Sequence, residues 1–184
     1  MTMATQSARI KFTYEDYKHT PEDKRYELID GELILTAAPR RVHQRMEIRL
    51  AVRLGAFVED RDLGEVYTAP FDVVLTDTDV VQPDLLFVSE ERLYIINDDN
   101  VRGAPDLIIE ILSPSTSGRD RTIKRTLYAL HGVKEFWLVD TDAKNITVMF
   151  LGEQGYEITG IYGEGQTLTS PTLEGFSLNL AEIF

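Results

Sequence analysis

The order of strand and helix patterns in this chain predicts an α/β fold in which helices flank a mixed sheet. A near-continuous apolar run at residues 107–111 predicts a strand that is buried on both faces. A helical pattern follows at residues 120–131, and a second apolar run comes directly after it at residues 135–140. Such a strand–helix–strand unit should be parallel and right-handed. The strands before it are expected to be antiparallel, which makes the sheet mixed.

The segments before the central strand predict a hairpin, a long helix and two more strands. Residues 25–29 and 32–36 are strand-like and flank Asp30-Gly31, a strong hairpin signal. After Pro39, apolar residues recur in steps of three and four, as on the buried face of a helix: Val42, Met46, Leu50, Leu54 and Phe57. Residues 66–75 and 80–88 predict two strands, and Pro83 marks the start of the second, a bulge in it or an edge position.

The remaining segments predict a second helix and a second hairpin. In the helix at residues 120–131, we expect Ile123, Leu127 and Leu130 to face the core and Gly132 to end the helix in a left-handed conformation. Residues 146–151 and 156–162 predict a hairpin around a glycine-containing turn. We therefore expect a single domain over residues 1–184, of which residues 1–11 form a loose tail.

The composition narrows the class of protein. A hydrophobic content of 43% is that of an ordinary globular chain. The sequence has no cysteine, which excludes disulfides and thiolate metal sites and favours a cytoplasmic location. It also has no apolar run of the length that a signal peptide or a membrane span needs. The net charge of −12 counts against a strong non-specific DNA binder, and the arginines of residues 40–53 are expected to solvate a helix.

Glu110 interrupts the apolar run of the central strand. A buried carboxylate must be protonated, paired with a cation or bound to a metal. Asp106 lies four residues earlier, about 13 Å away along the strand, so the two cannot share an ion. Asp84, on another strand, could pair with Glu110 to hold Mg²⁺ or Mn²⁺. The alternative is a strand-terminal Asp84 and a salt-bridged Glu110, and the residue types alone favour it slightly.

The helix that follows the central strand carries a second group of candidates. Asp120, Lys124 and Tyr128 are spaced by four and form a row beside the predicted buried face. Lys124 could therefore point back over the sheet, although a solvated Asp120–Lys124 pair is the explanation that these residues alone favour.

Three other polar residues have both a functional and a purely structural explanation. Glu32 in the first hairpin and His43 in the first long helix each fit either a site or the surface. Ser113 is followed by no adjacent histidine and is expected to cap a helix rather than act as a nucleophile.

Together these residues resemble the Uma-two family, restriction-endonuclease-like proteins of the PD-(D/E)XK nuclease superfamily. The similarity covers roughly residues 14–184. The matching motifs are Pro83-Asp84, residues 103–116, Asp120, Lys124, Tyr128 and residues 135–140, with residues 26–32 and His43 toward the N-terminus. The resemblance implies a restriction-endonuclease-like mixed sheet flanked by helices, to which N-terminal and C-terminal hairpins are added.

The resemblance also implies a role for each matched residue. Asp84 takes the place of the superfamily's metal-binding Asp, and Glu110 takes the acidic position of its second motif. The Lys that normally follows that acid by two residues is replaced by Leu112, and Lys124 on the next helix fits as its substitute. Besides the catalytic set of Asp84, Glu110 and Lys124, the metal ligands would include the Ile111 carbonyl, and a surrounding shell would contain Glu32, His43, Asp120 and Tyr128.

The function that this resemblance implies is a Mg²⁺- or Mn²⁺-dependent endonuclease that hydrolyses phosphodiester bonds of nucleic acid. DNA is the expected substrate and a homodimer the expected assembly. One alternative is a non-catalytic binding or regulatory module that retains the nuclease fold and an ion-pair remnant of the site. The acidic charge favours that module, whereas the intact Asp84, Glu110 and Lys124 favour the nuclease. A metal-dependent hydrolase of a smaller phosphate is a third reading.

Overall fold

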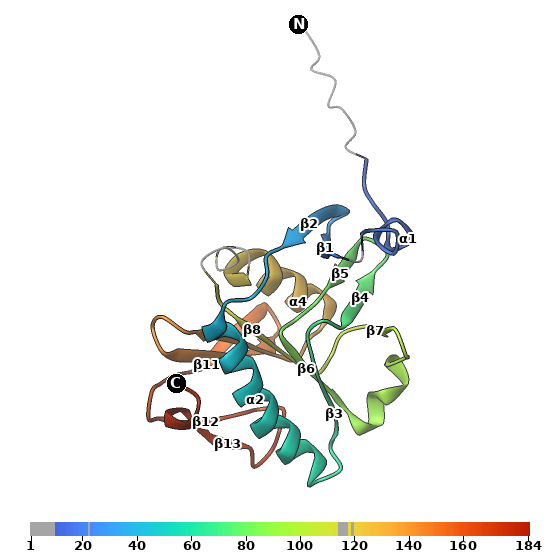
Figure 1. Ribbon diagram of the computed structural model, residues 1–184. Coiled ribbons are helices and arrows are strands. Elements are labelled where there is room, and N and C mark those ends of the chain that lie inside the picture. The colour runs from blue at the N-terminus through green and yellow to red at the C-terminus, as the bar shows by residue number, and fades with distance from the viewer. Residues whose placement is uncertain (1–9, 22, 114–117, 119) are drawn as a thin grey trace, which may run out of the picture.

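The computed structural model describes residues 10–21, 23–113, 118 and 120–184, and its largest sheet has six strands (Figure 1). The strand order is β11-β10-β9-β8-β6-β3. In chain order these strands are β3 (Gly64–Thr68), β6 (Leu85–Ser89), β8 (Leu107–Ile111), β9 (Glu135–Asp140), β10 (Asn145–Gly152) and β11 (Gly155–Gly163). The central pair, β8 and β9, is parallel, and the other neighbours are antiparallel. The mixed sheet predicted from the sequence is confirmed.

Helices lie on both faces of this sheet (Figure 1). The helix α2 (Arg41–Glu59) buries Met46, Leu50 and Leu54 against a core that includes Ile109 and Ile111 of β8. The opposite core holds Ile108 of β8 with side chains of α4 (Arg125–His131). Because successive side chains of a strand point to opposite faces, Glu110 points toward the α4 face. The strand that carries Glu110 is therefore buried on both sides, as its composition predicts.

The other strands form two smaller sheets. A five-stranded sheet has the order β2-β1-β5-β4-β7 and contains β1 (Arg25–Ile29), β2 (Glu32–Thr36), β4 (Asp72–Thr76), β5 (Asp79–Val81) and β7 (Asn100–Arg102). A two-stranded sheet pairs β12 (Thr167–Thr169) with β13 (Ser177–Asn179). The short helices are α1 (Tyr14–Tyr17), η1 (Glu90–Ile95), the π-helical turn η2 (Asp120–Lys124) and η3 (Leu180–Glu182). None of the helices in the described ranges is long and apolar enough to span a membrane.

Both predicted hairpins are confirmed. The strands β1 and β2 pair with Ile29 opposite Glu32, and Asp30 and Gly31 form the turn with positive φ angles of 49° and 74°. The strands β10 and β11 pair up to Gly152 opposite Gly155. The first hairpin joins the five-stranded sheet through Leu28 opposite Val80 of β5, so it lies against the segment that leads to Asp84.

The two long strands predicted at residues 66–75 and 80–88 are wrong as single elements. The first is divided into β3 and β4, which belong to different sheets, with Pro70 between them. The second is divided into β5 and β6 on either side of Pro83. Proline has no backbone N–H for the strand ladder, and at each of these points the chain leaves one sheet for the other. Asp84 consequently lies just before β6 and not within a strand.

Candidate active site

The carboxylate of Asp84 is held against the backbone of the central strand. The pairing of Leu85 with Ile109 would, one step further, set Asp84 opposite Glu110. The amide nitrogen of Ile111, the residue after Glu110, donates to Oδ2 of Asp84 at 2.6 Å. The side chain of Asp84 is therefore fixed at the end of β8, beside Glu110, its predicted partner.

His43 is part of this group and not a surface residue. Its Nε2 lies 3.1 Å from Oδ2 of Asp84, and its side chain is 12% exposed. Burial lowers the pKa of His43, but the hydrogen bond to Asp84 and the charges of Asp84 and Glu47 outweigh it, so the pKa is raised. The first turn of α2 thus brings an imidazole to the same carboxylate oxygen that the Ile111 amide contacts.

Glu47 is a neighbour that the sequence reasoning did not place at the site. Its Oε2 lies 3.7 Å from Nδ1 of His43, one helical turn earlier on α2. Burial, followed by the charge of Asp84, raises the pKa of Glu47. The spacing of four between His43 and Glu47 was the signal available in the sequence.

Glu110 is bound by two side chains of the following helical segment. Its Oε1 accepts hydrogen bonds from Nζ of Lys124 at 2.9 Å and from the hydroxyl of Tyr128 at 2.6 Å. All three residues are at least 96% buried. Lys124 is therefore buried beside Glu110 and is not solvated on the helix surface.

Glu27, which was not predicted to lie at the site, is the second carboxylate that contacts Lys124. Its Oε1 lies 2.7 Å from Nζ of Lys124, and the same atom accepts the amide of Gln82 at 3.2 Å. Glu27 is only 2% exposed, in the middle of β1. A glutamate at an inward position of a hairpin strand was the available signal. The ammonium of Lys124 therefore bridges the N-terminal hairpin and the central strand.

The π-helical turn η2 explains why Lys124 faces inward. The prediction that Ile123, Leu127 and Leu130 face the core is wrong for two of the three, because Ile123 is 49% and Leu130 is 77% exposed. A π turn has hydrogen bonds from i to i+5, so it winds more residues per turn than an α-helix and displaces the inward face. Lys124 and Tyr128, with Leu127, take the buried positions.

One pocket of about 270 Å³ collects most of these side chains. Its lining includes Glu27, Asp84, Glu110, Ile111 and Lys124, together with His43 and Ser113. Arg25 and Arg40 also line it. Glu32 is exposed at the start of β2 and does not belong to the lining. The side chain of Asp120 and residues 114–117 of the matched motif lie outside the described residues.

The donor set of the pocket fits a hard divalent cation with few protein ligands. Asp84 and Glu110 supply carboxylate oxygens, the ligand type that Mg²⁺ and Mn²⁺ prefer. Within the described ranges, no group of three or more His, Asp or Glu side chains is arranged to hold a metal ion. Mg²⁺ commonly binds through one or two carboxylates and retains several waters, so a two-carboxylate site suits it.

Asp106 belongs to a different network. Its carboxylate is paired with Arg92 and Lys134, each at 2.8 Å, and it accepts the amide of Ser89 at 2.9 Å. Burial raises the pKa of Asp106, but these partners outweigh it and hold the pKa below the usual value. Asp106 ties the start of β8 to β6 and takes no part in the pocket.

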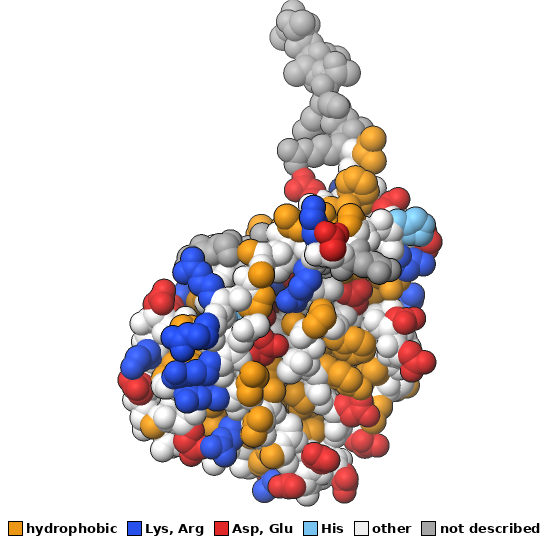
Figure 2. Space-filling model, in the orientation of Figure 1, with side chains coloured by type: hydrophobic (Ala, Val, Ile, Leu, Met, Phe, Trp, Pro, Cys, Tyr) orange, Lys and Arg blue, Asp and Glu red, His pale blue; other side chains and the backbone are white. Residues whose placement is uncertain are grey.

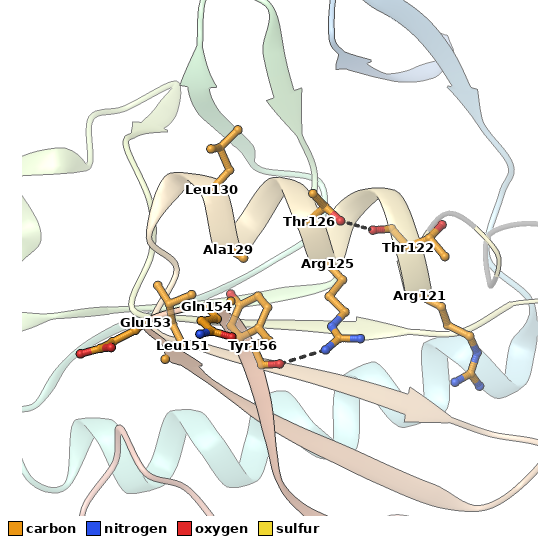
Figure 3. Close-up of a pocket in the computed structure, with 12 residues that line it drawn as sticks. Arg121, Thr122, Arg125, Thr126, Ala129, Leu130, Leu151, Glu153, Gln154 and Tyr156 are labelled. Atoms are coloured by element: carbon orange, nitrogen blue, oxygen red, sulfur yellow. Dashed lines mark hydrogen bonds between the residues drawn. The ribbon is translucent and has the colours of Figure 1, made fainter.

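A larger pocket of about 700 Å³ lies between the η2–α4 segment and the β10–β11 hairpin (Figure 3). Arg121 and Arg125 line it, but Arg125 donates to the carbonyl of Tyr156 at 2.9 Å and Arg121 pairs with Asp140 at 2.6 Å. Glu153 is the carboxylate of its lining. The smaller pocket, in contrast, is lined by three carboxylates, those of Glu27, Asp84 and Glu110.

Comparison with known proteins agrees with this fold. The family model Uma2, described as "putative restriction endonuclease", matches residues 13–181. The crystal structure of a "putative nuclease belonging to DUF820" from Anabaena variabilis superposes with a TM-score of 0.78, at 21% identity, over 94% of this chain and 97% of that one. The protein sll1609 of Synechocystis sp., whose printed description is "uncharacterized", is 26% identical over 141 residues, which is 75% of this chain and 79% of that protein.

Proposed function

Because the chain belongs to the Uma2 family, we propose that it is a metal-dependent endonuclease that hydrolyses phosphodiester bonds of DNA. The observation that carries this proposal is the meeting of Asp84, Glu110 and Lys124 at one pocket, although they come from three separate segments. Two carboxylates can hold a metal ion that activates a water molecule, and an ammonium can stabilise the negative charge that develops on the phosphate.

In this proposal, Asp84 and Glu110 hold Mg²⁺ or Mn²⁺, with the Ile111 carbonyl as a further oxygen ligand. The bound ion would lower the pKa of a coordinated water and stabilise charge on the phosphate. The side chains around these ligands would orient them, as partners of metal ligands commonly do. His43 and the Ile111 amide fix one oxygen of Asp84, and Tyr128 fixes one oxygen of Glu110.

Lys124 takes the catalytic lysine's role in the proposal. Its ammonium lies beside Glu110, at the lining of the pocket, where it would orient the attacking water and offset the negative charge that builds on the phosphate. Leu112, the position where the superfamily has this lysine, is 7% exposed and packs in the α4-side core. Lys124 of η2 therefore contacts Glu110 in place of a lysine at position 112.

The experiment that tests the proposal is a cleavage assay on single-stranded and double-stranded DNA and RNA with Mg²⁺ or Mn²⁺. We expect cleavage of DNA by the wild-type protein and none by Glu110→Ala. Glu164→Gln is a matched control, because this exposed carboxylate pairs with Lys144 and neither residue belongs to the pocket lining. Absence of cleavage with every substrate and both ions would contradict the proposal.

One observation favours a second candidate, a non-catalytic binding module. Lys124 is already shared between Glu27 and Glu110, so the cluster could persist as a structural ion pair without a metal. In that case neither ion would bind, and Glu110→Gln would change only stability. A titration of the protein with Mn²⁺ separates the two candidates before any substrate is known.

A further inference from the structure

A row of arginines runs along α2 away from the candidate active site. Arg41, Arg45, Arg49 and Arg53 are spaced by four, so they form one line on the helix surface with steps of about 6 Å. Figure 2 shows Lys and Arg side chains gathered in a column on the side of the molecule where Figure 1 places α2 and the C-terminal end. The row is continuous with Arg40, the N-cap residue of α2.

The charge of this segment is opposite to that of the whole chain. Residues 40–53 contain five arginines and one acid, Glu47, so their formal charge is +4, whereas the chain carries −12. Glu47 points to His43 and is partly buried, so it is not interleaved with the arginines. Clustering of positive charge on an acidic protein creates a local field that attracts an anion.

The C-terminal segment forms hydrogen bonds and an ion pair with only some of these arginines. Arg49 donates through Nη1 to the carbonyls of Ile183 and Phe184, and Arg45 donates through Nη2 to Phe184. Arg53 pairs with Glu182 at 2.7 Å. A guanidinium has five N–H donors, so these contacts orient Arg45 and Arg49 and leave donors for another ligand. Arg41 is exposed at the end of the row nearest the pocket.

The row begins at the pocket that contains Asp84 and Glu110. Arg40 and His43 of the α2 N-terminal region line that pocket, and Arg25 lines it from β1. An extended polyanion whose one phosphate enters the pocket could therefore continue over Arg40, Arg41 and Arg45 without crossing an acidic side chain of α2.

We propose that Arg40, Arg41, Arg45 and Arg49 bind successive phosphates of the nucleic-acid strand whose scissile phosphodiester occupies the pocket. This inference rests on the proposed nuclease function, since it assigns the surface that holds the substrate on one side of the cleavage point. Arginine suits this role because its planar group makes paired hydrogen bonds to phosphate oxygens. Contacts of this kind position the strand and carry no sequence information.

The test is the salt dependence of binding, measured without metal so that cleavage does not occur. The probe is a fluorescein-labelled DNA duplex of about 20 base pairs, titrated from 50 to 200 mM salt. Each lost phosphate contact reduces the slope of log K against log salt by about 0.9. The variant Arg41→Gln/Arg45→Gln should therefore lower the slope by about 1.8, whereas Arg61→Gln/Arg102→Gln, with the same change in charge at exposed positions, should leave it nearly unchanged.

An equal slope in the two double variants would overturn the inference. If Arg45→Gln loosens the C-terminal segment, as an altered melting temperature would report, Arg41→Gln alone must still lower the slope by about 0.9. The outcome is separate from that of the cleavage assay. A protein that never cleaves but shows the reduced slope retains the phosphate contacts of the arginine row and loses the nuclease function, whereas an active protein with an unchanged slope loses the arginine contacts.

Discussion

The ammonium of Lys124 lies 2.7 Å from Oε1 of Glu27, so a residue of the N-terminal hairpin fixes the position of the proposed catalytic lysine. The same ammonium is 2.9 Å from Glu110. Two carboxylates on one buried lysine leave the group with a net negative charge when all three are ionised. This excess of negative charge favours the binding of a cation. Although Glu27 is on a different sheet from Glu110, we expect it to position the ammonium of Lys124.

Replacing Glu27 should affect the chemical step more than metal binding. In Glu27→Ala, Lys124 keeps Glu110 but loses its second anchor, and we expect cleavage under saturating substrate to fall about 10–100-fold. Glu27→Gln retains an acceptor for Lys124 and for the Gln82 amide, so it should recover part of the rate. Single-turnover kinetics on both variants measure this, and equal rates in Glu27→Ala and the wild type would show that Lys124 needs no such anchor.

Metal binding should raise the melting temperature through Asp84 and Glu110. A ligand that binds only the folded state at 100 times its Kd stabilises that state by about 2.7 kcal/mol. Thermal unfolding across a Mn²⁺ titration should show this rise in the wild type and lose it in Glu110→Gln, in which Lys124 still has Glu27. Glu164→Gln should respond like the wild type. A rise that persists in Glu110→Gln would place the ion elsewhere.

The Asp106 network should contribute a pH-dependent part of the stability. The pKa of Asp106 is lowered in the folded state, so its contribution is present above its unfolded pKa of about 3.9 and is lost as the pH falls through the folded pKa. In Asp106→Asn, Arg92 and Lys134 lose their carboxylate, and we expect roughly 3 kcal/mol less stability at pH 7.

Chemical denaturation of Asp106→Asn at a series of pH values is the corresponding measurement. The difference in unfolding free energy between wild type and variant should shrink below about pH 4. A constant difference from pH 7 to pH 3 would contradict the assignment.

The sequence predicted the elements with strong local signals. The β8–β9 strand unit, the hairpin at Asp30-Gly31 and the buried Met46, Leu50 and Leu54 each depend on periodicity or turn chemistry within a few residues. The same is true of Glu110, because a single acid within an apolar strand is conspicuous in the sequence. Asp84 and Lys124 were candidates from their places on another strand and on the following helix, and the resemblance to the family favoured them over the structural ion-pair alternatives.

What the sequence did not predict depends on contacts between distant segments. Nothing near Glu27 in the sequence indicates that its partner is Lys124, 97 positions later. The π turn at residues 120–124 also leaves no clear periodic signal, so an ideal helix was assumed and Ile123 and Leu130 were turned inward by mistake. Similarly, Pro83 was expected to interrupt a strand and Pro70 was not, because the passage of the chain between two sheets depends on how the whole chain packs.

The most direct measurement of the central claim is single-turnover DNA cleavage by Lys124→Ala at saturating Mn²⁺, with Mn²⁺ affinity measured on the same protein. Lysine is not a metal ligand here, so the affinity should remain within a few-fold, while the rate should fall by at least about 100-fold. Because Lys124→Ala removes the ammonium that two buried carboxylates share, Glu27→Gln/Lys124→Met serves as a charge-balanced second variant. Lys124→Arg should also be slow, because a planar guanidinium cannot occupy the position of the ammonium. Cleavage by Lys124→Ala and the balanced variant at the wild-type rate would contradict the claim that Lys124 is the catalytic lysine.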